Sequence, residues 1–457
     1  MSDDEAKLSG QTLREIFEAV LPAKHLRAIV VKARFGERDR KRDAVGLLRA
    51  MVIAAGTGYG GRQADVARIY FENGARPVVR GGFYAWFGPE LEQAMHAVVR
   101  SAIDYGTSLP LDLPPLLSKY ARDFHIVDSS TVKLPQELFD QYPGAGEYAA
   151  LKVHKRLSVG LGTVVDYHIS PARDHDSIHL QIDETWRGLG LLIDLGYASA
   201  KRLRECETHG VVFVVRLKEN WKPRVECIRR GQVTATFLAG SDLDALLDDG
   251  TLLLDGRVID ATVSVGPAGQ AVRCRLVGVP GPDGDYHFYL SNLPSTVGPH
   301  QIADIYRVRW EIESDNKLDK SCNHLDEIAA RTGPAARALV HASLVSSMLA
   351  CLIVHRDRLS QRRPPSGGAE RTSPPLHPQS LARAMASAAV RIATTLDLDP
   401  ITAAHQWQKI ADYLAHLGRD PNWRSRPSVL DQMRGWRISP GRPRRASIAA
   451  SSRPRAN

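Results

Sequence analysis

The stretch LGLLID (189–194) decides the fold, because it is a continuous apolar run that ends in a carboxylate. A run of this kind is typical of a central strand buried on both faces. Three further strand-like segments precede it, FHIVD (124–128), LKVHKRLSV (151–159) and TVVDYHIS (163–170). A fourth, VVFVVRLK (211–218), follows it and is again apolar. These segments predict a sheet with 189–194 at its centre.

Helices complete the pattern. One is predicted over 176–186, one after Ser199 as N-cap, and one over 300–324. The order is therefore three strands, helix, strand, helix, strand. This order predicts an α/β fold with a ribonuclease H-like mixed sheet. Short β segments between Gly, Pro and Asp turns fill 222–297 and predict a β module inserted before the last helix.

Helical patterns flank this core on both sides. Around 62–87, two short helices with Arg62, Arg68, Arg76 and Arg80 nearby fit either a helix-turn-helix reader of DNA or an ordinary small helical domain. The predicted organisation is a helical DNA-binding region (1–107), a catalytic core (120–221 and 298–355) holding the β insertion (222–297), a linker (356–379), a helical region (380–420) and a basic, disordered tail (421–457).

Composition favours a polyanionic partner. The 457 residues include 60 Lys plus Arg against 51 Asp plus Glu, a net charge of +9. Such an excess fits nucleic acid, although a solvated surface can also produce it. The five cysteines are scattered and predict neither a zinc site nor disulfides. The apolar stretch 338–354 contains His341 and three serines, so we expect a buried helix and a soluble, cytoplasmic, nucleoid-associated protein without membrane contact.

A second informative segment is IYRVRWEIESDNKLDK (305–320). On one continuous α-helix, four of its side chains fall within roughly 60° of arc. They are Tyr306, Arg309, Glu313 and Lys320. The ordinary interpretation of such a pattern is a solvated face with i,i+4 ion pairs.

The strand ends change that balance. Asp128 ends FHIVD and Asp194 ends LGLLID, and reactive groups gather at the carboxyl ends of strands in α/β sheets. A carboxylate directly after a buried run is costly to desolvate unless a cation compensates it. Two such aspartates with Glu313 on a helix above them predict a site for hard divalent cations, able to support two-metal phosphoryl transfer. Taken singly, each aspartate also fits a turn residue after a strand.

Two other sets of polar residues fit an ordinary structural interpretation as well as a functional one. ARDHDSIH (172–179) suggests a metal site, but acidic residues at a helix start account for it more simply. Lys152, His154 and Arg156 alternate along one strand face, where they fit either DNA contacts or ordinary exposed charges.

The spacing Tyr-x2-Arg-x3-Glu-x6-Lys, met by Tyr306, Arg309, Glu313 and Lys320, resembles the signature of bacterial insertion-sequence transposases of the insertion-sequence-four type. VDSST around Asp128, and IDLGYASAKRLRE with VVFVVRLK after it, are similar to further blocks of that family. The resemblance covers about 120–355.

The resemblance implies a DNA transposase that cuts and joins DNA. Asp128, Asp194 and Glu313 would bind Mg²⁺, with Mn²⁺ as a substitute, and Tyr306, Arg309 and Lys320 would hold phosphates. It also implies double-stranded DNA partners, the transposon inverted-repeat ends and the target, and a homodimer on them. Some relatives flip a base onto a tryptophan of the insertion. Here the matching strand, YHFYLSNLP (286–294), has no Trp, which leaves a hairpin step open.

Two alternatives remain at this point. One is a metal-dependent nuclease with the same core but no strand transfer. The other is a domesticated DNA-binding protein without catalysis, against which the intact set of three carboxylates argues.

Overall fold

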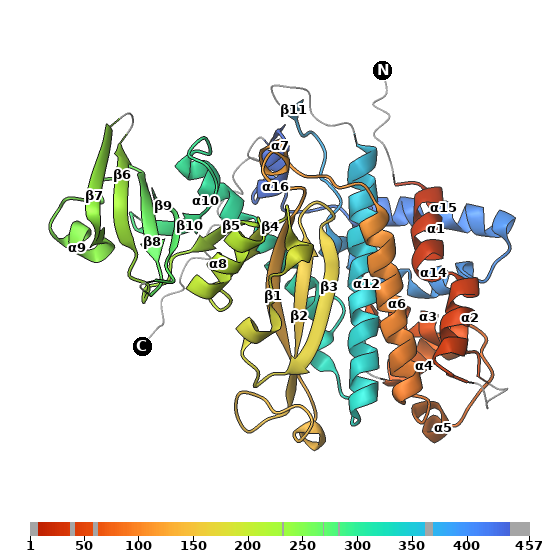
Figure 1. The fold of residues 1–457 in the computed structure, drawn as a ribbon. Helices are drawn as coiled ribbons and strands as arrows, with labels where there is room; N and C mark the ends of the chain where they lie inside the picture. Colours follow the sequence, from red (N-terminus) through yellow and green to blue (C-terminus); the bar gives the residue numbers. More distant parts are fainter. Residues whose placement is uncertain are drawn as a thin grey trace, which may run out of the picture.

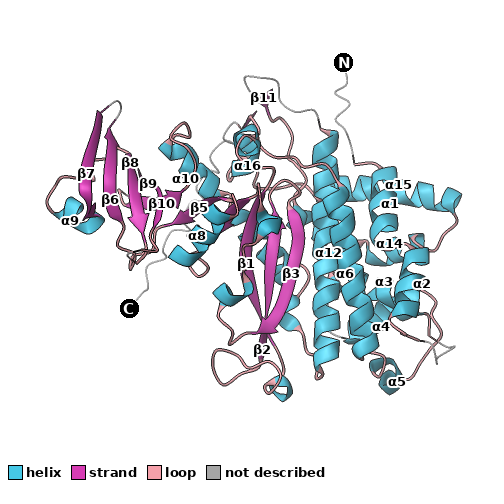
Figure 2. Ribbon diagram, in the orientation of Figure 1, coloured by secondary structure: helices cyan, strands magenta, loops and turns pink. Residues whose placement is uncertain are grey.

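The computed structural model describes residues 8–36, 42–57, 63–230, 233–267, 269–281, 284–361 and 369–438. Helices gather on one side of a long sheet, and the sheet projects away from them at its far end (Figures 1 and 2). The helices are α1 (Gly10–Val20), α2 (Ala23–Lys32), α3 (Ala44–Ala55), α4 (Gln63–Glu72), α5 (Arg80–Tyr84), α6 (Pro89–Ser108), α7 (Pro115–Ser118), α8 (Ala200–Thr208), α9 (Leu243–Asp248), α10 (Pro299–Arg307), α11 (Trp310–Ser321), α12 (Gly333–Ser360), α13 (Pro378–Ser387), α14 (Ala389–Thr395), α15 (Pro400–Leu417) and α16 (Val429–Met433).

The core of the sheet has the predicted topology. Its strand order is β3-β2-β1-β4-β5, with β1 parallel to β4, β4 parallel to β5, and β2 antiparallel to both of its neighbours. This is the ribonuclease H-like arrangement, so that prediction is confirmed. The strands are β1 (Phe124–Lys133), β2 (Ala150–Ser158), β3 (Thr163–Pro171), β4 (Gly190–Ile193) and β5 (Val212–Arg216).

Burial on both faces explains why β4 is central. Leu191 and Ile193 pack into one hydrophobic cluster and Leu192 into another, and all three are fully buried. β1 alternates in the same way, with Ile126 on one face and Val127 on the other. The sheet thus separates two apolar layers, and burying each of these side chains contributes about 1.5–3 kcal/mol.

The insertion extends the sheet and does not form a module beside it. β10 pairs antiparallel with β5, and the remaining strands continue outward in the order β9-β8-β6-β7. The result is a ten-stranded mixed sheet. The added strands are β6 (Arg224–Arg230), β7 (Val233–Asp242), β8 (Ile259–Val265), β9 (Val272–Pro280) and β10 (Tyr286–Ser291).

The apolar helix α12 is the centre of the helical side. It is long and apolar enough to cross a membrane by length and composition, but its most apolar stretch is completely buried in the protein. α6 packs along it, and α1, α3 and α13 contact it as well. It is therefore a core helix, as the polar residues His341 and Ser343 inside it suggested.

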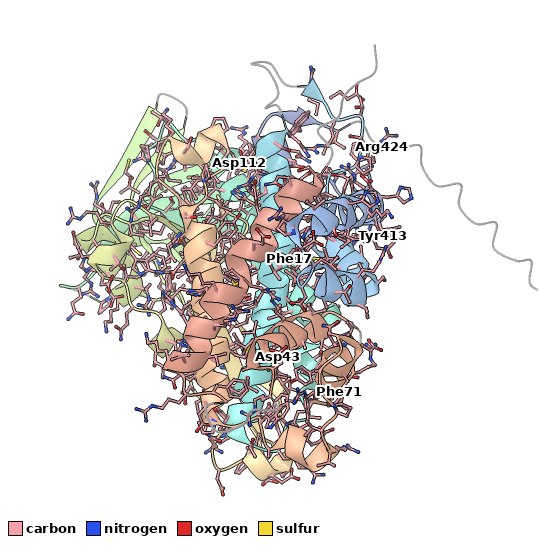
Figure 3. The ribbon with its side chains drawn as sticks, turned by 90° about the vertical axis from the view of Figure 1, so that its right-hand side faces the viewer. Phe17, Asp43, Phe71, Asp112, Tyr413 and Arg424 are labelled. Carbon is pink, nitrogen blue, oxygen red and sulfur yellow. The ribbon has the colours of Figure 1, made fainter. Side chains whose placement is uncertain are left out.

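N-terminal and C-terminal helices form one layer. α1 lies against α15, and Figure 3 shows Phe17 of α1 on the side that faces α15, the helix that carries Tyr413. Phe17 stacks on Trp407 with ring centroids 5.1 Å apart, and both side chains are buried. The predicted region 1–107 therefore shares its core with residues from 380–420.

Several predicted boundaries need correction. Residues 176–186 form two short 3-10 turns, Asp176–His179 and Glu184–Trp186, in place of one helix. The linker predicted from 356 begins later, because α12 continues to Ser360. The tail predicted from 421 holds α16 and a short strand, β12 (Trp436–Arg437), which pairs with β11 (Ala369–Glu370). Residues 362–368 and 439–457, and Arg62 of the predicted DNA reader, lie outside the described residues.

The stacked pair of Phe17 and Trp407 gives a test of this shared core. Trp407→Ala should lower the free energy of unfolding by about 3–5 kcal/mol, because it leaves a cavity between α1 and α15. Chemical denaturation measures it. Ile401→Ala on the same helix is the control, since Ile401 is 86% exposed and should change stability by less than about 0.5 kcal/mol. Equal effects of the two substitutions would contradict the shared core.

Candidate functional site

Asp128 and Asp194 lie side by side. β1 and β4 pair in parallel up to Val127 and Ile193, so the next residue on each strand is an aspartate. Adjacent strands are about 4.8 Å apart. The sequence predicted that this strand ends at Asp128. In the structure, β1 continues to Lys133 and pairs there with β2 alone. The two carboxylates thus meet where β4 stops.

Hydrogen bonds hold the Asp128 carboxylate. Its Oδ1 accepts from the backbone N–H of Ser129 at 2.8 Å, and its Oδ2 accepts from Nδ2 of Asn316 at 3.0 Å. Burial raises the pKa of Asp128, the Ser129 bond opposes the rise, and the nearby Asp194 adds to it. The Asp194 carboxylate has no hydrogen bond within the described part of the chain, although its carbonyl accepts a turn bond from Tyr197. A turn role for Asp194 therefore does not use its side chain.

The helix predicted over 300–324 is two helices joined by a tight turn. Arg309 N–H bonds to Tyr306 O at 2.9 Å and Glu311 N–H bonds to Val308 O at 2.9 Å, each three residues back. Such bonds are of the 3-10 kind and turn more tightly than an α-helix. The turn separates α10, which carries Tyr306, from α11, which carries Glu313.

α11 carries Glu313 on the side of the helix that contacts Asp128. Asn316, which bonds to Asp128, is one turn after Glu313 on the same face of α11. Glu313 itself accepts a hydrogen bond at 2.8 Å from Nη2 of Arg309. The exposed fractions of the two side chains are 30% for Glu313 and 11% for Arg309. The pair lies beside the aspartates and is shielded from solvent mainly on the arginine side.

Tyr306 and Arg309 belong to the same cluster. The Tyr306 ring is buried and packs on Tyr289 of β10 at 5.2 Å between centroids. Burial raises the pKa of Tyr306 to about 12, with Arg309 opposing and Asp194 adding to the rise. Burial lowers the pKa of Arg309, but Tyr306, Glu313 and Asp194 outweigh it and leave the pKa raised. Arg309 is thus the cation that faces the carboxylates.

Lys320 lies apart from this cluster. It is seven residues after Glu313, so it is about 10 Å farther along α11 on the same face. It is half-buried. Of the six residues singled out from the sequence, Tyr306, Arg309 and Glu313 lie near Asp128 and Asp194. Lys320 is the one that lies farther away, along α11.

A family model covers the part of the chain that holds Asp128, Asp194 and Glu313. Residues 119–349, just over half of the chain, match the family model described as the transposase DDE domain. The chain belongs to this family. The transposase for insertion sequence element IS231B of Bacillus thuringiensis subsp. berliner is 24% identical over 240 residues, 43% of this chain and 49% of that protein. The putative transposase InsL for insertion sequence element IS186A of Escherichia coli (strain K12) is 39% identical over 61 residues, 13% of this chain and 16% of that one.

The chain spans about half the length of the IS231-type relatives it matches. A solved structure, the piggyBac transposase synaptic complex with hairpin DNA, aligns over 93% of this chain and 91% of that one, with 9% identity and a TM-score of 0.44.

The donor set of this DDE transposase domain suits a hard divalent cation. Asp128 and Asp194 offer carboxylate oxygens, and the buried Oδ1 of Asn316 has no hydrogen-bond partner among the described residues. Glu313 is turned toward Arg309, and no three His, Cys, Asp or Glu side chains in the described ranges converge as metal ligands. While Arg309 holds Glu313, the three carboxylates thus do not converge on one point in the described part of the chain.

Sequence reasoning missed Asn316 and Trp310. Asn316 follows Glu313 by three residues, and this helical spacing was the available signal. Trp310 is 57% exposed at the start of α11, with the Arg309 guanidinium 5.7 Å from its ring centroid. Nothing in the local sequence distinguishes such an exposed tryptophan from a core one.

It also missed a buried lysine. Lys155 of β2 is fully buried between Asp315 and Asp319 of α11. Its neighbours Lys152, His154 and Arg156 were predicted as exposed or DNA-facing and need correction.

Each of these three side chains has protein partners. Lys152 pairs with Asp176, buried His154 bonds to Ser170, and Arg156 lies over the Trp186 ring. Asp176 also accepts from Ser129, so the 172–179 segment braces the strand that carries Asp128.

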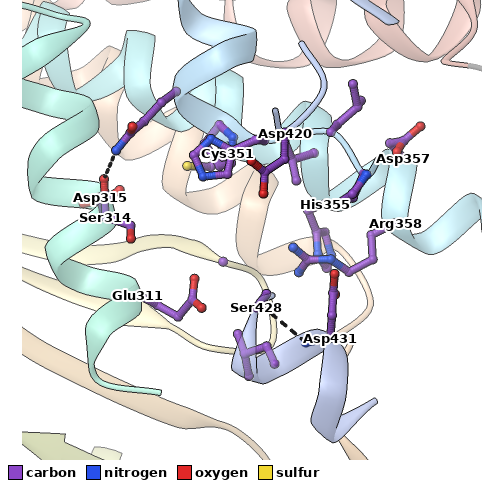
Figure 4. Close-up of a pocket in the computed structure, with 18 of the residues that line it drawn as sticks. Glu311, Ser314, Asp315, Cys351, His355, Asp357, Arg358, Asp420, Ser428 and Asp431 are labelled. Atoms are coloured by element: carbon purple, nitrogen blue, oxygen red, sulfur yellow. Dashed lines mark hydrogen bonds between the residues drawn. The ribbon is translucent and has the colours of Figure 1, made fainter. Parts of the chain in front are cut away.

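A cavity lies between α11 and α12 (Figure 4). Helical spacing places the α11 residues that line it on the side of the helix away from Glu313. Glu311, Ser314 and Asp315 line it from α11, and His355, Asp357 and Arg358 line it from α12. Burial raises the pKa of Glu311 and raises that of Asp357 to about 6. Its acidic and basic lining groups are mixed, and it is separate from the carboxylates of the candidate site.

We predict that the closeness of the Asp128 and Asp194 carboxylates lowers the stability of the protein. Without divalent cations, Asp128→Asn should raise the free energy of unfolding by roughly 0.5–2 kcal/mol. The substitution removes a buried like charge, and the Asn316 amide can flip to accept from the new amide. Because the folded-state pKa of Asp128 is raised, the wild-type carboxylate costs stability above that pKa, progressively less as the pH falls below it, and nothing below the unfolded-state pKa. The gain should therefore be present at neutral pH and disappear in acid.

Urea unfolding at several pH values in EDTA measures this gain. Asp304→Asn, at an exposed position of α10, is the control. A destabilised Asp128→Asn protein at neutral pH would contradict the proposed crowding.

Proposed function

We propose that the chain is a DNA transposase that uses Asp128, Asp194 and Glu313 to cleave transposon ends and transfer them into target DNA. The observation that carries the proposal is the juxtaposition of Asp128 and Asp194 at neighbouring strand ends, with Asn316 of the Glu313 helix bonded to Asp128. Family membership supports it independently. Mg²⁺ is the proposed cofactor, with Mn²⁺ as a substitute.

The proposed cut-and-paste transposition includes two phosphoryl transfers on the strand that is joined to the target. In the first, a water oxygen bonds to the phosphorus at the transposon end and the bond to the 3′ oxygen breaks, leaving a 3′-hydroxyl. In the second, that hydroxyl oxygen bonds to a target phosphorus and displaces the target strand's 3′ oxygen. A bound divalent cation polarises the phosphate and favours the deprotonated nucleophile.

Arg309 has a distinct part in this proposal. Its 2.8 Å bond neutralises Glu313 in the absence of DNA. A DNA phosphate competes for the guanidinium, since arginine binds phosphate in a bidentate manner. Transfer of Arg309 to the phosphate frees Glu313 to turn toward the aspartates, so that DNA binding and completion of the cation site are coupled.

Other groups extend the DNA surface. Tyr306 and Lys320 are proposed to contact phosphates on either side of Arg309, with Lys320 about 10 Å along the helix from Glu313. Trp310 offers an exposed aromatic face on which an unstacked base can lie. Tyr289 of the insertion is buried against Tyr306 and is a poorer platform. We expect a homodimer on paired transposon ends, as the resemblance implies.

A ribonuclease H-like nuclease is the second candidate, because it shares the carboxylates and the first transfer. A joining assay separates the two functions. Pre-cut ends carrying the inverted repeats that flank the gene are mixed with target plasmid and Mg²⁺. Joined products support the transposase, and cleavage without any joined product supports the nuclease.

Glu313→Gln tests the proposed catalytic role. It keeps the size and the bond from Arg309 but removes the charge, so we expect cleavage of an end-containing duplex to fall at least about 100-fold, as when a group that stabilises the transition state is lost. DNA binding should stay within about threefold. Asp304→Asn on α10 is the control and should cleave like the wild type. Unchanged cleavage by Glu313→Gln would reject Glu313 as a catalytic residue.

A further inference from the structure

Lys155 is an ammonium group with no exposure to solvent. Its Nζ lies 2.5 Å from Oδ2 of Asp315 and 2.6 Å from Oδ2 of Asp319. The exposed fractions of the three side chains are 0% for Lys155, 5% for Asp315 and 1% for Asp319. Ser347 of α12 donates a hydrogen bond to the other oxygen of Asp319. The cluster therefore joins β2, α11 and α12 at one buried point.

This buried cluster is next to the candidate site. Lys155 is the register partner of Asp128 across β1 and β2. On α11, Asp315 lies between Glu313, the proposed ligand, and Asn316, which bonds to Asp128. Lys155 thus links β2, the strand next to the one that carries Asp128, to α11, the helix that carries Glu313.

A gain in the stability of the fold does not by itself explain why three charged side chains are buried together. One lysine and two aspartates carry a net formal charge of −1 in the interior, and apolar residues of similar size usually stabilise a core as well or better. Ionic hydrogen bonds do provide direction, because each fixes the positions of two atoms. Apolar contacts allow a helix to slide or rotate more freely.

The required accuracy is high. Moving an α-helix by one residue shifts it about 1.5 Å along its axis and turns it by about 100°. A misplacement of about 1 Å at a catalytic group can reduce a rate by about 100-fold. A small error in the register of α11 is therefore enough to direct Glu313 away from Asp128 and Asp194.

We propose that Lys155, clamped between Asp315 and Asp319, is a positioning residue that fixes the register and rotation of α11 and so directs Glu313 toward Asp128 and Asp194. The proposal rests on the proposed function. It assigns no contact with DNA or with the reacting atoms to Lys155.

The test uses a neutral replacement of the whole cluster. Lys155→Met alone leaves two buried carboxylates without a cation and should fold poorly. The triple variant Lys155→Met, Asp315→Asn, Asp319→Asn removes all three charges with little change in volume. An asparagine at 319 can still accept from Ser347, so this variant should melt within a few degrees of the wild type.

Cleavage and binding are then measured separately on a duplex that carries the transposon end. For the triple variant we expect cleavage at saturating DNA to fall 10- to 100-fold and the Mg²⁺ concentration for half-maximal cleavage to rise. The Kd for the duplex should stay within threefold. Asp315→Asn alone keeps one ionic bond and should give an intermediate loss. Ser314→Ala, an exposed position on the same helix, is the control and should behave as the wild type.

A folded triple variant that cleaves within threefold of the wild type would overturn the positioning role. So would the full return of activity when the two asparagines are added to Lys155→Met, since that pattern indicates charge balance alone. A wild-type protein that does not cleave with Mg²⁺ or Mn²⁺ would instead overturn the proposed function. The two failures are therefore distinguishable.

Discussion

Parallel pairing between β1 and β4 stops at Val127 and Ile193, and this end point brings Asp128 and Asp194 together. Both strands are buried on two faces, so their register cannot change without moving apolar side chains into the wrong layer. The two carboxylates are therefore held close by the hydrophobic core and not by attraction between them. Burial, with a contribution from Asp194, raises the pKa of Asp128, and this rise is the electrostatic cost of that placement.

The position of the third carboxylate, that of Glu313, depends on hydrogen bonds and ion pairs and not on strand pairing. Glu313 belongs to a helix that is separated from α10 by a 3-10 turn and held against the sheet by Asn316 and Lys155. Its own side chain is paired with Arg309. Two aspartates held by the sheet thus lie near a glutamate whose side chain is paired with Arg309. In the proposed function, that side chain turns when Arg309 binds a DNA phosphate.

The sequence predicted the local features of this protein and not the distant ones. Apolar runs located the five core strands, and strand ends and helical spacing selected Asp128, Asp194 and Glu313. The break at Val308 and Arg309 contains no Gly or Pro, so no local signal announced it. Burial of Lys155 depends on aspartates 160 and 164 residues away. Pairing of β10 with β5 is equally non-local, and it turned a predicted module into the outer half of one sheet.

The central claim is that Asp128, Asp194 and Glu313 form one divalent-cation site. The most direct test is anomalous diffraction from crystals of the protein with DNA ends and Mn²⁺, using Glu313→Gln protein for comparison. We expect a Mn²⁺ peak between Asp128 and Asp194, with a Glu313 oxygen within about 2.5 Å of a bound ion and Arg309 on a DNA phosphate. A peak elsewhere, or a Glu313 that still bonds to Arg309 beside an occupied aspartate pair, would contradict it.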